Sequence, residues 1–399
     1  MSVDGRAYPR DLHTDFDIDD PSLSSDFEGV MNQLVAECPV AKSRKGTGYA
    51  VINRYKDVRA CALDWRTFSS EGGWMLNAPK GNVTILPEDC DPPYHDKWRQ
   101  VLNPPFSKPS VAKLTEYVRE KAAALLDPMV AKGECEFVAD FAAKFPGIIL
   151  FERIFPVPVE DLPQLFDDID IYSFGPLEER VAAFERVHAY LEQFLRSRHA
   201  SPPQGDIVDG IVAGVDKNGE TCPWEDRVYA ALDVVFGGLA TTTHAIAAAI
   251  FHLAAHPDIR RDLLDNPDLV DNAVAETVRL YAPVVAPART VTRSVEIAGV
   301  PFEPGDRIAL NLAAASRDPD ACANPTRFDL RRDDVVHTAF GVGPHRCLGE
   351  HLARLEIKVV IEEFLKRIPD FSLKPGMWPG HTSEQMRSMR DLHLVWPSR

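Results

Sequence analysis

The stretch "HTAFGVGPHRCLGEHLARLEI", residues 337–357, places a cysteine between a glycine-rich turn and a segment with the apolar spacing of a helix. Gly341 and Gly343 favour a tight turn, because glycine adopts backbone conformations that other residues resist. Leucines recur at three- and four-residue intervals after Cys347, which predicts a helix that begins close to the cysteine.

The position of Cys347 near a predicted helix N-terminus favours a thiolate. Unpaired backbone N–H groups and the positive end of the helix dipole converge there, and both are expected to lower the pKa of the thiol. A thiolate is a ligand that soft metal centres prefer. The alternative is a small apolar side chain that packs in the core.

The composition is that of a soluble globular protein, with 399 residues, 45% hydrophobic and 26% charged. A net charge of −16 disfavours a nucleic-acid partner, because no basic field attracts phosphates.

The seven cysteines are scattered without a C-x-x-C motif, so we expect no disulfide framework or structural zinc site and a reducing, cytoplasmic location. The polar segment 1–25 lacks the order of a signal peptide, and we expect no membrane anchor.

Helical patterns dominate the chain, and no linker divides it. We predict a single domain over residues 1–399 that is mainly α with a small β portion. Helices are predicted over 110–133 and 176–200. Residues 223–257 have a proline at each end and none between, which predicts one very long, central helix. Extended segments are predicted near 48–55, 286–312 and 370–397.

The cysteine stretch resembles the haem-binding loop of cytochromes P450, whose pattern is F-x-x-G-x-[HR]-x-C-x-G. The fixed positions are filled by Phe340, Gly343, His345, Cys347 and Gly349. The resemblance extends over residues 26–396 and is closest to the soluble bacterial, camphor-hydroxylating branch. It implies the cytochrome P450 fold, a prism-like helical domain with haem b between the long central helix and the cysteine-loop helix. It also implies that Cys347 is the ligand of the haem iron.

Two further motifs agree with this resemblance. "ETVR" contains Glu276 and Arg279, which lie on one helix face and can pair. In the family this pair forms an ion-pair network with an arginine of a downstream loop, and "NPTRFDL" suggests Arg327 as that third member. The network is expected to be structural and to brace the haem pocket from behind.

"HDKWR" contains the second motif, His95 and Arg99, whose counterparts in the family bind the haem propionates. Cationic donors suit carboxylates because the hydrogen bonds are charge-assisted. Arg289 and His345 match the remaining propionate partners. The resemblance thus implies a cofactor-binding set made of His95, Arg99, Arg289, His345, Phe340, Gly341, Gly349 and Gly237.

The sequence "GGLATTT", residues 237–243, departs from the family pattern [AG]-G-x-[DE]-T. The threonine is present as Thr241, but Ala240 stands in place of the acid. Gly237 and Gly238 are expected to let a flat ligand approach the helix closely.

The missing acid bears on proton delivery. The Thr241 hydroxyl is expected to hold oxygen and its water, whereas the family's acid helps to relay protons. With Ala240, the relay must use water, Thr242, Asp233 or His244, although His244 is more readily explained as a satisfied core histidine. Ala240 therefore predicts slower or leakier oxygen activation.

The resemblance places the substrate pocket among several separated segments. The predicted residues are Trp74, Met75, Leu76, Val83, Ile171, Phe174, Leu239, Val284, Val285, Gln385 and Met386, with Gly238, Ala240, Thr241 and Thr242 next to the chemistry. Most of these residues are apolar, which suggests a hydrophobic, terpenoid-sized substrate.

The expected activity is that of a monooxygenase, which uses two electrons and O₂ to insert one oxygen atom into a C–H or C=C bond. No redox module is fused to the chain, so electrons are expected from a separate iron–sulfur ferredoxin with its NAD(P)H-dependent reductase. A basic patch of Lys97, Arg99, Arg346 and Arg354 could steer that partner to a monomeric enzyme. Alternatives are a peroxide-driven family member, because of Ala240, and a haem-based sensor or gas carrier.

Overall fold

The computed structural model describes residues 8–76, 84–215, 219–382 and 384–397, with only the backbone at Phe174 and Leu177. Helices dominate, as predicted, and strands form small sheets. The helices of the first half are η1 (Pro21–Ser25), α1 (Phe27–Glu37), α2 (Tyr55–Leu63), α3 (Tyr94–Phe106), α4 (Lys108–Ala112), α5 (Thr115–Val130), η2 (Val138–Ala142), α6 (Phe145–Ile149), η3 (Leu150–Ile154), η4 (Val159–Asp161), α7 (Leu162–Phe174) and α8 (Leu177–His199).

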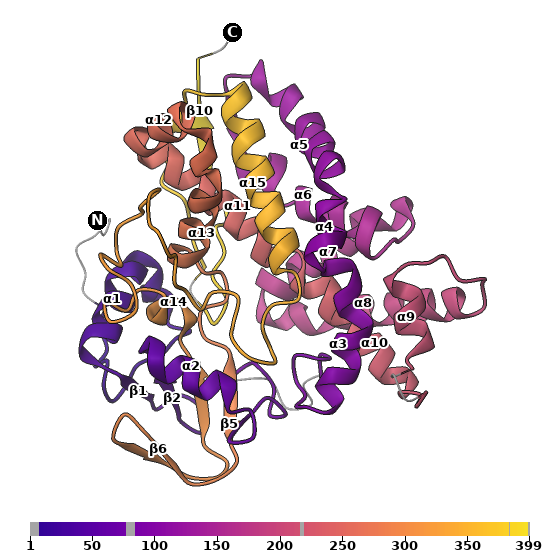
Figure 1. Cartoon of the computed structure of the whole chain (residues 1–399), viewed down its shortest axis with the longest axis vertical. Helices are drawn as coiled ribbons and strands as arrows, with labels where there is room; N and C mark the ends of the chain where they lie inside the picture. The colour runs from indigo at the N-terminus through magenta and orange to yellow at the C-terminus, as the bar shows by residue number, and fades with distance from the viewer. Residues whose placement is uncertain (1–7, 77–83, 216–218, 383, 398–399) are drawn as a thin grey trace.

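The second half continues the helical body and ends on the helix that follows the cysteine. Its helices are α9 (Ile207–Ala213), α10 (Trp224–Gly237), α11 (Ala240–Ala255), α12 (Pro257–Asp265), η5 (Pro267–Leu269), α13 (Val270–Leu280), α14 (Leu312–Ala315) and α15 (Glu350–Arg367). Figure 1 shows α15 and α5 side by side, with α11 and α13 next to them.

Helix α11 passes through the centre of the protein. Every one of its residues except Thr241 and Ala255 is buried. Trp224–Ala255 is long and apolar enough to cross a membrane by length and composition, but 72% of its most apolar window is buried inside the protein. It is therefore a core helix, as its low polarity predicts.

The prediction of one unbroken helix over 223–257 is wrong in one respect, because the helix is interrupted between Gly237 and Ala240. At this break the carbonyl of Gly237 accepts a hydrogen bond from the side-chain hydroxyl of Thr241 at 2.9 Å. Pro223 and Pro257 indicated where the helical segment begins and ends but gave no sign of an interruption inside it. The predicted helix over 110–133 is likewise divided, into α4 and α5.

The strands form a five-stranded, a three-stranded and a two-stranded sheet. They are β1 (Val40–Ser43), β2 (Tyr49–Ile52), β3 (Phe68–Ser69), β4 (Glu134–Glu136), β5 (Ala288–Val291), β6 (Val295–Ile297), β7 (Val300–Phe302), β8 (Arg307–Leu310), β9 (Ser372–Leu373) and β10 (His393–Val395). The largest sheet has the order β1-β2-β8-β5-β3, with β2 and β8 parallel and the other neighbours antiparallel. It lies at one corner of the molecule, beside α1 and α2 (Figure 1).

The extended segments predicted near 48–55, 286–312 and 370–397 contain β2, β5 to β8, β9 and β10. The sequence pattern missed β1, β3 and β4, which are short and lie in other parts of the chain. Residues 8–25 also differ from the expected polar arm. Phe16 and Ile18 are fully or almost fully buried, and the Phe16 N–H donates to the carbonyl of Lys42 in β1 at 2.8 Å.

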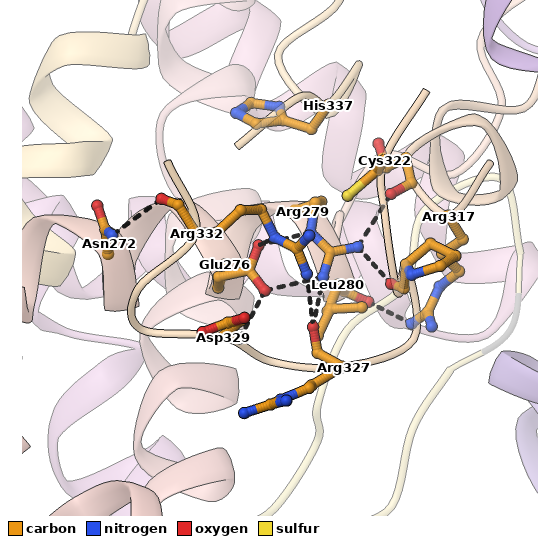
Figure 2. Close-up of polar contacts among 12 residues, drawn as sticks. Asn272, Glu276, Arg279, Leu280, Arg317, Cys322, Arg327, Asp329, Arg332 and His337 are labelled. Atoms are coloured by element: carbon orange, nitrogen blue, oxygen red, sulfur yellow. Dashed lines mark hydrogen bonds and ion pairs between the residues drawn. The ribbon is translucent and has the colours of Figure 1, made fainter. Parts of the chain in front are cut away.

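The predicted pair of Glu276 and Arg279 lies on α13 and is completely buried (Figure 2). The Arg279 guanidinium binds both carboxylate oxygens of Glu276, at 2.7 and 2.9 Å. Its remaining N–H groups donate to the carbonyls of Ser316, Pro325 and Arg327. All five donors are satisfied, and the loop that contains these carbonyls is fastened to α13.

Arg327 is not the side-chain member of this network. Its side chain is exposed and points away from Glu276, and only its carbonyl takes part (Figure 2). Arg332 supplies the second guanidinium, with Nε 3.1 Å from the Glu276 carboxylate, and it also donates to the Arg327 carbonyl at 3.1 Å. The motif could show that the loop takes part but not which arginine turns inward.

We expect Arg332→Ala to lower the free energy of unfolding by about 1–3 kcal/mol, because a buried carboxylate loses a charged donor. Arg327→Ala keeps the carbonyl and is expected to stay within about 0.5 kcal/mol of the parent. Denaturant unfolding of the two variants measures both values. Equal losses in both variants would contradict this account of the network.

Candidate functional site

A cavity of about 250 Å³ lies between the α10–α11 helix pair and the cysteine loop. Its walls come from segments far apart in the sequence: the loop before α3, α3 itself, the α10–α11 break, β5, the cysteine loop and the first turns of α15. The cavity brings together most residues that were predicted for the cofactor and the chemistry. These are His95, Arg99, Gly237, Gly238, Thr241, Thr242, Arg289, Phe340, Gly341, His345, Cys347 and Gly349.

The cysteine loop turns as its glycines predict. Gly341 and Gly343 have φ of +69° and +78°, in the left-handed region that glycine tolerates best. A Cβ on Gly343 would also lie 2.6 Å from the carbonyl oxygen of Ala62, so no larger residue fits there. The Cys347 N–H donates to the Phe340 carbonyl at 2.7 Å, which closes the turn and directs the cysteine to the cavity.

The predicted lowering of the Cys347 pKa is wrong for the polypeptide by itself. Burial raises the pKa of this thiol to about 11, against a weaker opposing effect of the Gly349 backbone N–H. Helix α15 begins only at Glu350, and its N-terminus does not outweigh the desolvation. A thiolate at Cys347 therefore needs an additional positive charge beside the sulfur, such as a metal ion.

Cationic and imidazole side chains gather at another part of the wall. His95 and Arg99 lie one turn apart on α3, Arg289 lies on β5, and the rings of His95 and His345 are 4.6 Å apart. His95 is 2% exposed, and its Nε2 has no partner within the described chain. Burial lowers the pKa of His345 to about 2, so this ring is neutral at physiological pH.

The two arginines retain donors for an anion. Among the described residues, Arg99 makes no hydrogen bond or ion pair, and the guanidinium of Arg289 donates only to the Ala288 carbonyl at 2.7 Å. Desolvation lowers the pKa of both groups, and nearby carboxylates, Glu88 among them, offset this effect only in part. This part of the cavity is suited to carboxylates.

The opposite wall is a face of the interrupted helix. Asp233, Gly237 and Thr241 recur every fourth residue and all line the cavity, with Gly238 and Thr242 beside them. A Cβ on Gly237 would meet no atom within 4 Å, because it would project into the cavity. The helix therefore presents a bare backbone to whatever the cavity holds, as a close approach of a flat ligand requires.

Ala240 and His244 do not line the cavity. Ala240 is 8% exposed and faces the core. His244 is completely buried, and its Nδ1 accepts a hydrogen bond from the Met389 N–H at 2.9 Å. His244 is therefore a core histidine, as predicted, but not a fully satisfied one, because its Nε2 has no partner within the described chain. Asp233 and Thr242 are left as the relay candidates that reach the cavity.

The substrate prediction fits the cavity poorly. Val284 lines it, whereas Val83 lies outside the described residues and the side chain of Phe174 is not described. The other predicted residues do not line it; they are Trp74, Met75, Leu76, Ile171, Leu239, Val285, Gln385 and Met386.

Gln385 illustrates the reason for this difference. Its amide donates to the carbonyls of Trp74 and Ala286 and accepts a hydrogen bond from the Leu76 N–H at 2.7 Å. The side chain thus holds two segments together and has little capacity left for a ligand.

The sequence prediction missed Glu88, which lines the cavity from the loop that leads into α3. The only signal was its position in the acidic stretch "PEDCDPPYH", directly before His95. The missed apolar wall includes Phe106 of α3 and Leu150 of η3.

These residues fit an iron porphyrin. A lone cysteine on one wall supplies a metal ligand, and the bare helix surface at Gly237 admits a flat ring. The free donors of Arg99 and Arg289 and the unpartnered Nε2 of His95 suit its two carboxylates. A porphyrin would supply ring nitrogens as further metal ligands, so the site would need only Cys347 from the protein.

Comparisons with known proteins agree with this geometry. The family model described as Cytochrome P450 matches residues 150–390. A probable cytochrome P450 127A1 of Sinorhizobium fredii is 32% identical over 89% of this chain and 85% of that protein. The vitamin D(3) 25-hydroxylase of Pseudonocardia autotrophica is 30% identical over 86% of this chain and 87% of that protein.

Solved structures of the family also superimpose over nearly the whole chain. The crystal structure of cytochrome P450 CYP101C1 has a TM-score of 0.86 at 28% identity, and that of CYP101J2 has a TM-score of 0.85 at 28% identity. Each comparison covers 98% of both chains. With the cysteine loop, the bare helix and the cationic wall around one cavity, these matches show that the chain belongs to the cytochrome P450 family and is a P450 monooxygenase.

Proposed function

We propose that this enzyme binds haem b through Cys347 and oxidises a hydrophobic small molecule. One observation carries the proposal: the Cys347 thiol, the bare helix at Gly237 and the unpaired cations open onto the same cavity. Cys347 would be the iron ligand, and His95, Arg99, Arg289 and His345 would bind the propionates.

The bound haem would supply the reaction with O₂, in which two electrons reduce one oxygen atom to water and the other enters the substrate. The chain's own residues would control which molecules enter the cavity and how protons are delivered to the bound oxygen. Cys347 as a thiolate would donate electron density to the iron. The Thr241 hydroxyl lies at the cavity wall, where it can exchange its bond to the Gly237 carbonyl for one to water.

The substrate preference follows from the rest of the wall. Apolar side chains from separate elements line the cavity, among them Phe106, Leu150, Val234 and Val284. An apolar pocket of this kind favours a compact hydrophobic molecule.

We expect Cys347→Ser to remove the thiolate signature without unfolding the protein, because the hydroxyl is nearly isosteric but does not donate electron density as a thiolate does. The absorption spectrum of the reduced, carbon-monoxide-treated protein measures this change. Cys322→Ser, at a buried cysteine outside the cavity, is the matched control and is expected to keep the spectrum. An unchanged spectrum in Cys347→Ser would overturn the proposed ligand.

Ala240 bears on how protons reach the oxygen. Neither Ala240 nor His244 faces the cavity, which leaves water, Thr242 and Asp233 as the groups in contact with it. A slow relay loses reducing equivalents as peroxide, and a peroxide-driven reaction is the alternative that Ala240 favours.

We expect Ala240→Asp to raise the product formed per electron and to lower peroxide release about two-fold or more, because it restores a titratable group beside Thr241, as in the family pattern. Ala240→Asn is the control of equal size that cannot titrate. Unchanged or lower coupling in Ala240→Asp would contradict the role given to this position. Turnover with hydrogen peroxide but not with redox partners would favour the alternative.

We also propose that a separate ferredoxin and its reductase deliver the electrons, in the cytoplasm, to a monomeric enzyme. The basic patch predicted for docking is smaller than expected. Arg99 faces the cavity, Lys97 pairs with Glu220 at 2.8 Å, and Arg354 pairs with Glu350 at 3.2 Å. Arg346 also pairs with Glu350, yet its side chain is 63% exposed next to the cysteine loop.

We expect Arg346→Gln to slow the first electron transfer from an acidic iron–sulfur ferredoxin several-fold at low salt, because a charge that attracts the partner is lost. The difference should disappear at high salt, where such attractions are screened. Stopped-flow reduction measures both rates, and Arg261→Gln on the exposed face of α12 is the control. Equal rates at low salt would exclude this docking site.

A further inference from the structure

The cavity contains two carboxyl groups that have no part in holding the proposed haem. Glu88 enters from the loop before α3, and Asp233 enters from α10. Both line the cavity, and neither makes a hydrogen bond or an ion pair with any described residue. Asp89, the neighbour of Glu88, differs, because its carboxylate accepts from the N–H groups of Trp74 and Ile85.

The electrostatic surroundings of these two groups are unfavourable for negative charge. Burial raises the pKa of Glu88, and the nearby Arg289 only partly offsets this effect. Burial and the neighbouring Glu88 raise the pKa of Asp233 well above its ordinary value, with Arg99 opposing. The only cations that oppose this effect are Arg289 and Arg99, and both act through the cavity without a hydrogen bond to either carboxyl group among the described residues.

The proposed cofactor would engage these two arginines. Its two propionates would take Arg99 and Arg289 as counterions, and burial lowers the pKa values of His95 and His345, so neither adds charge. Among the described residues that line the cavity, the remaining cation is Arg346, and it pairs with Glu350 at 2.7 Å, so Glu88 and Asp233 are left without a counterion.

A third carboxyl group of the cavity is separate evidence for missing positive charge or donors. Glu356 of α15 lines the same cavity, is 1% exposed, and has one carboxylate oxygen without a partner within the described chain. Buried polar groups are normally paired, so orphaned groups around a cavity indicate an occupant that satisfies them.

We infer that the substrate is a compact hydrophobic molecule with a positively charged nitrogen, held between Glu88 and Asp233. This inference deepens the proposed function and rests on it. An apolar body would fit Phe106, Leu150 and Val234, and the ammonium group would neutralise the acids. A carboxylate-bearing substrate would be repelled, and a purely apolar one would leave both acids unpaired.

The test compares two ligands of nearly equal size on the haem-loaded enzyme by equilibrium dialysis. Benzyltrimethylammonium carries a permanent charge and has no lone pair to bind iron, and 2,2-dimethylpropylbenzene is its neutral carbon analogue. We expect the cation to bind at least ten-fold more tightly at neutral pH. Equal or weaker binding of the cation would overturn the inference.

Variants locate the effect within the cavity. The double variant Glu88→Gln, Asp233→Asn is expected to bind the cation at least ten-fold more weakly, while its affinity for the neutral analogue changes less than two-fold. Asp258→Asn, at an exposed carboxylate of α12, is the control. Retained cation affinity in the double variant would place the charge recognition elsewhere and contradict the assignment.

The spectrum of the carbon monoxide complex separates failure of the inference from failure of the proposed function. A wild-type protein without the thiolate signature would refute the haem site itself. A wild-type protein with that signature but without the cation preference would refute only the inference. The comparison of the two ligands on the wild-type protein decides the question even where the double variant fails to fold.

Discussion

The position of the Cys347 sulfur, inside the protein but exposed to the cavity, is the constraint on which the site depends. Desolvation raises the pKa of the thiol to about 11, and the N–H of Gly349 opposes this only weakly. Without a cation beside the sulfur, the protonated thiol is therefore favoured over the thiolate. The rest of the cavity suits a flat, anionic group that carries such a cation. The helix surface at Gly237 is bare, and Arg99 and Arg289 have donors free to bind carboxylates.

The fold makes this arrangement possible by joining distant segments around α11. The interruption at Gly238 and Leu239 opens the helix where the cavity lies, and the Thr241 hydroxyl satisfies the carbonyl of Gly237. Behind the cavity, Arg279 and Arg332 hold Glu276 and fasten the loop 316–332 to α13. Behind the pocket the buried charges of Glu276 and Arg279 are thus fully paired, whereas Arg99, Glu88 and Asp233 on the cavity wall have no hydrogen-bond partner among the described residues.

Charge balance separates these two regions. Glu276 is buried but bound by two guanidinium groups, so it needs no ligand. Glu88 and Asp233 are also carboxyl groups, but they are half-buried at the cavity wall and have no hydrogen-bond partner among the described residues. This contrast is the physical basis for assigning one group to structure and the other to recognition of a cation.

Local patterns in the sequence determined the elements that depend on short-range rules: the glycine turn before Cys347, the helical class, the ends of the central helix, and the residues of the cysteine, H-x-x-x-R and E-x-x-R motifs. Only the tertiary structure decided which side chains share the cavity. It turned Arg332 inward in place of Arg327, used Gln385 to hold a loop, and added Glu88 to the wall. Spacing along the chain sets local conformation, whereas burial, pairing and pKa depend on neighbours that lie far away in sequence.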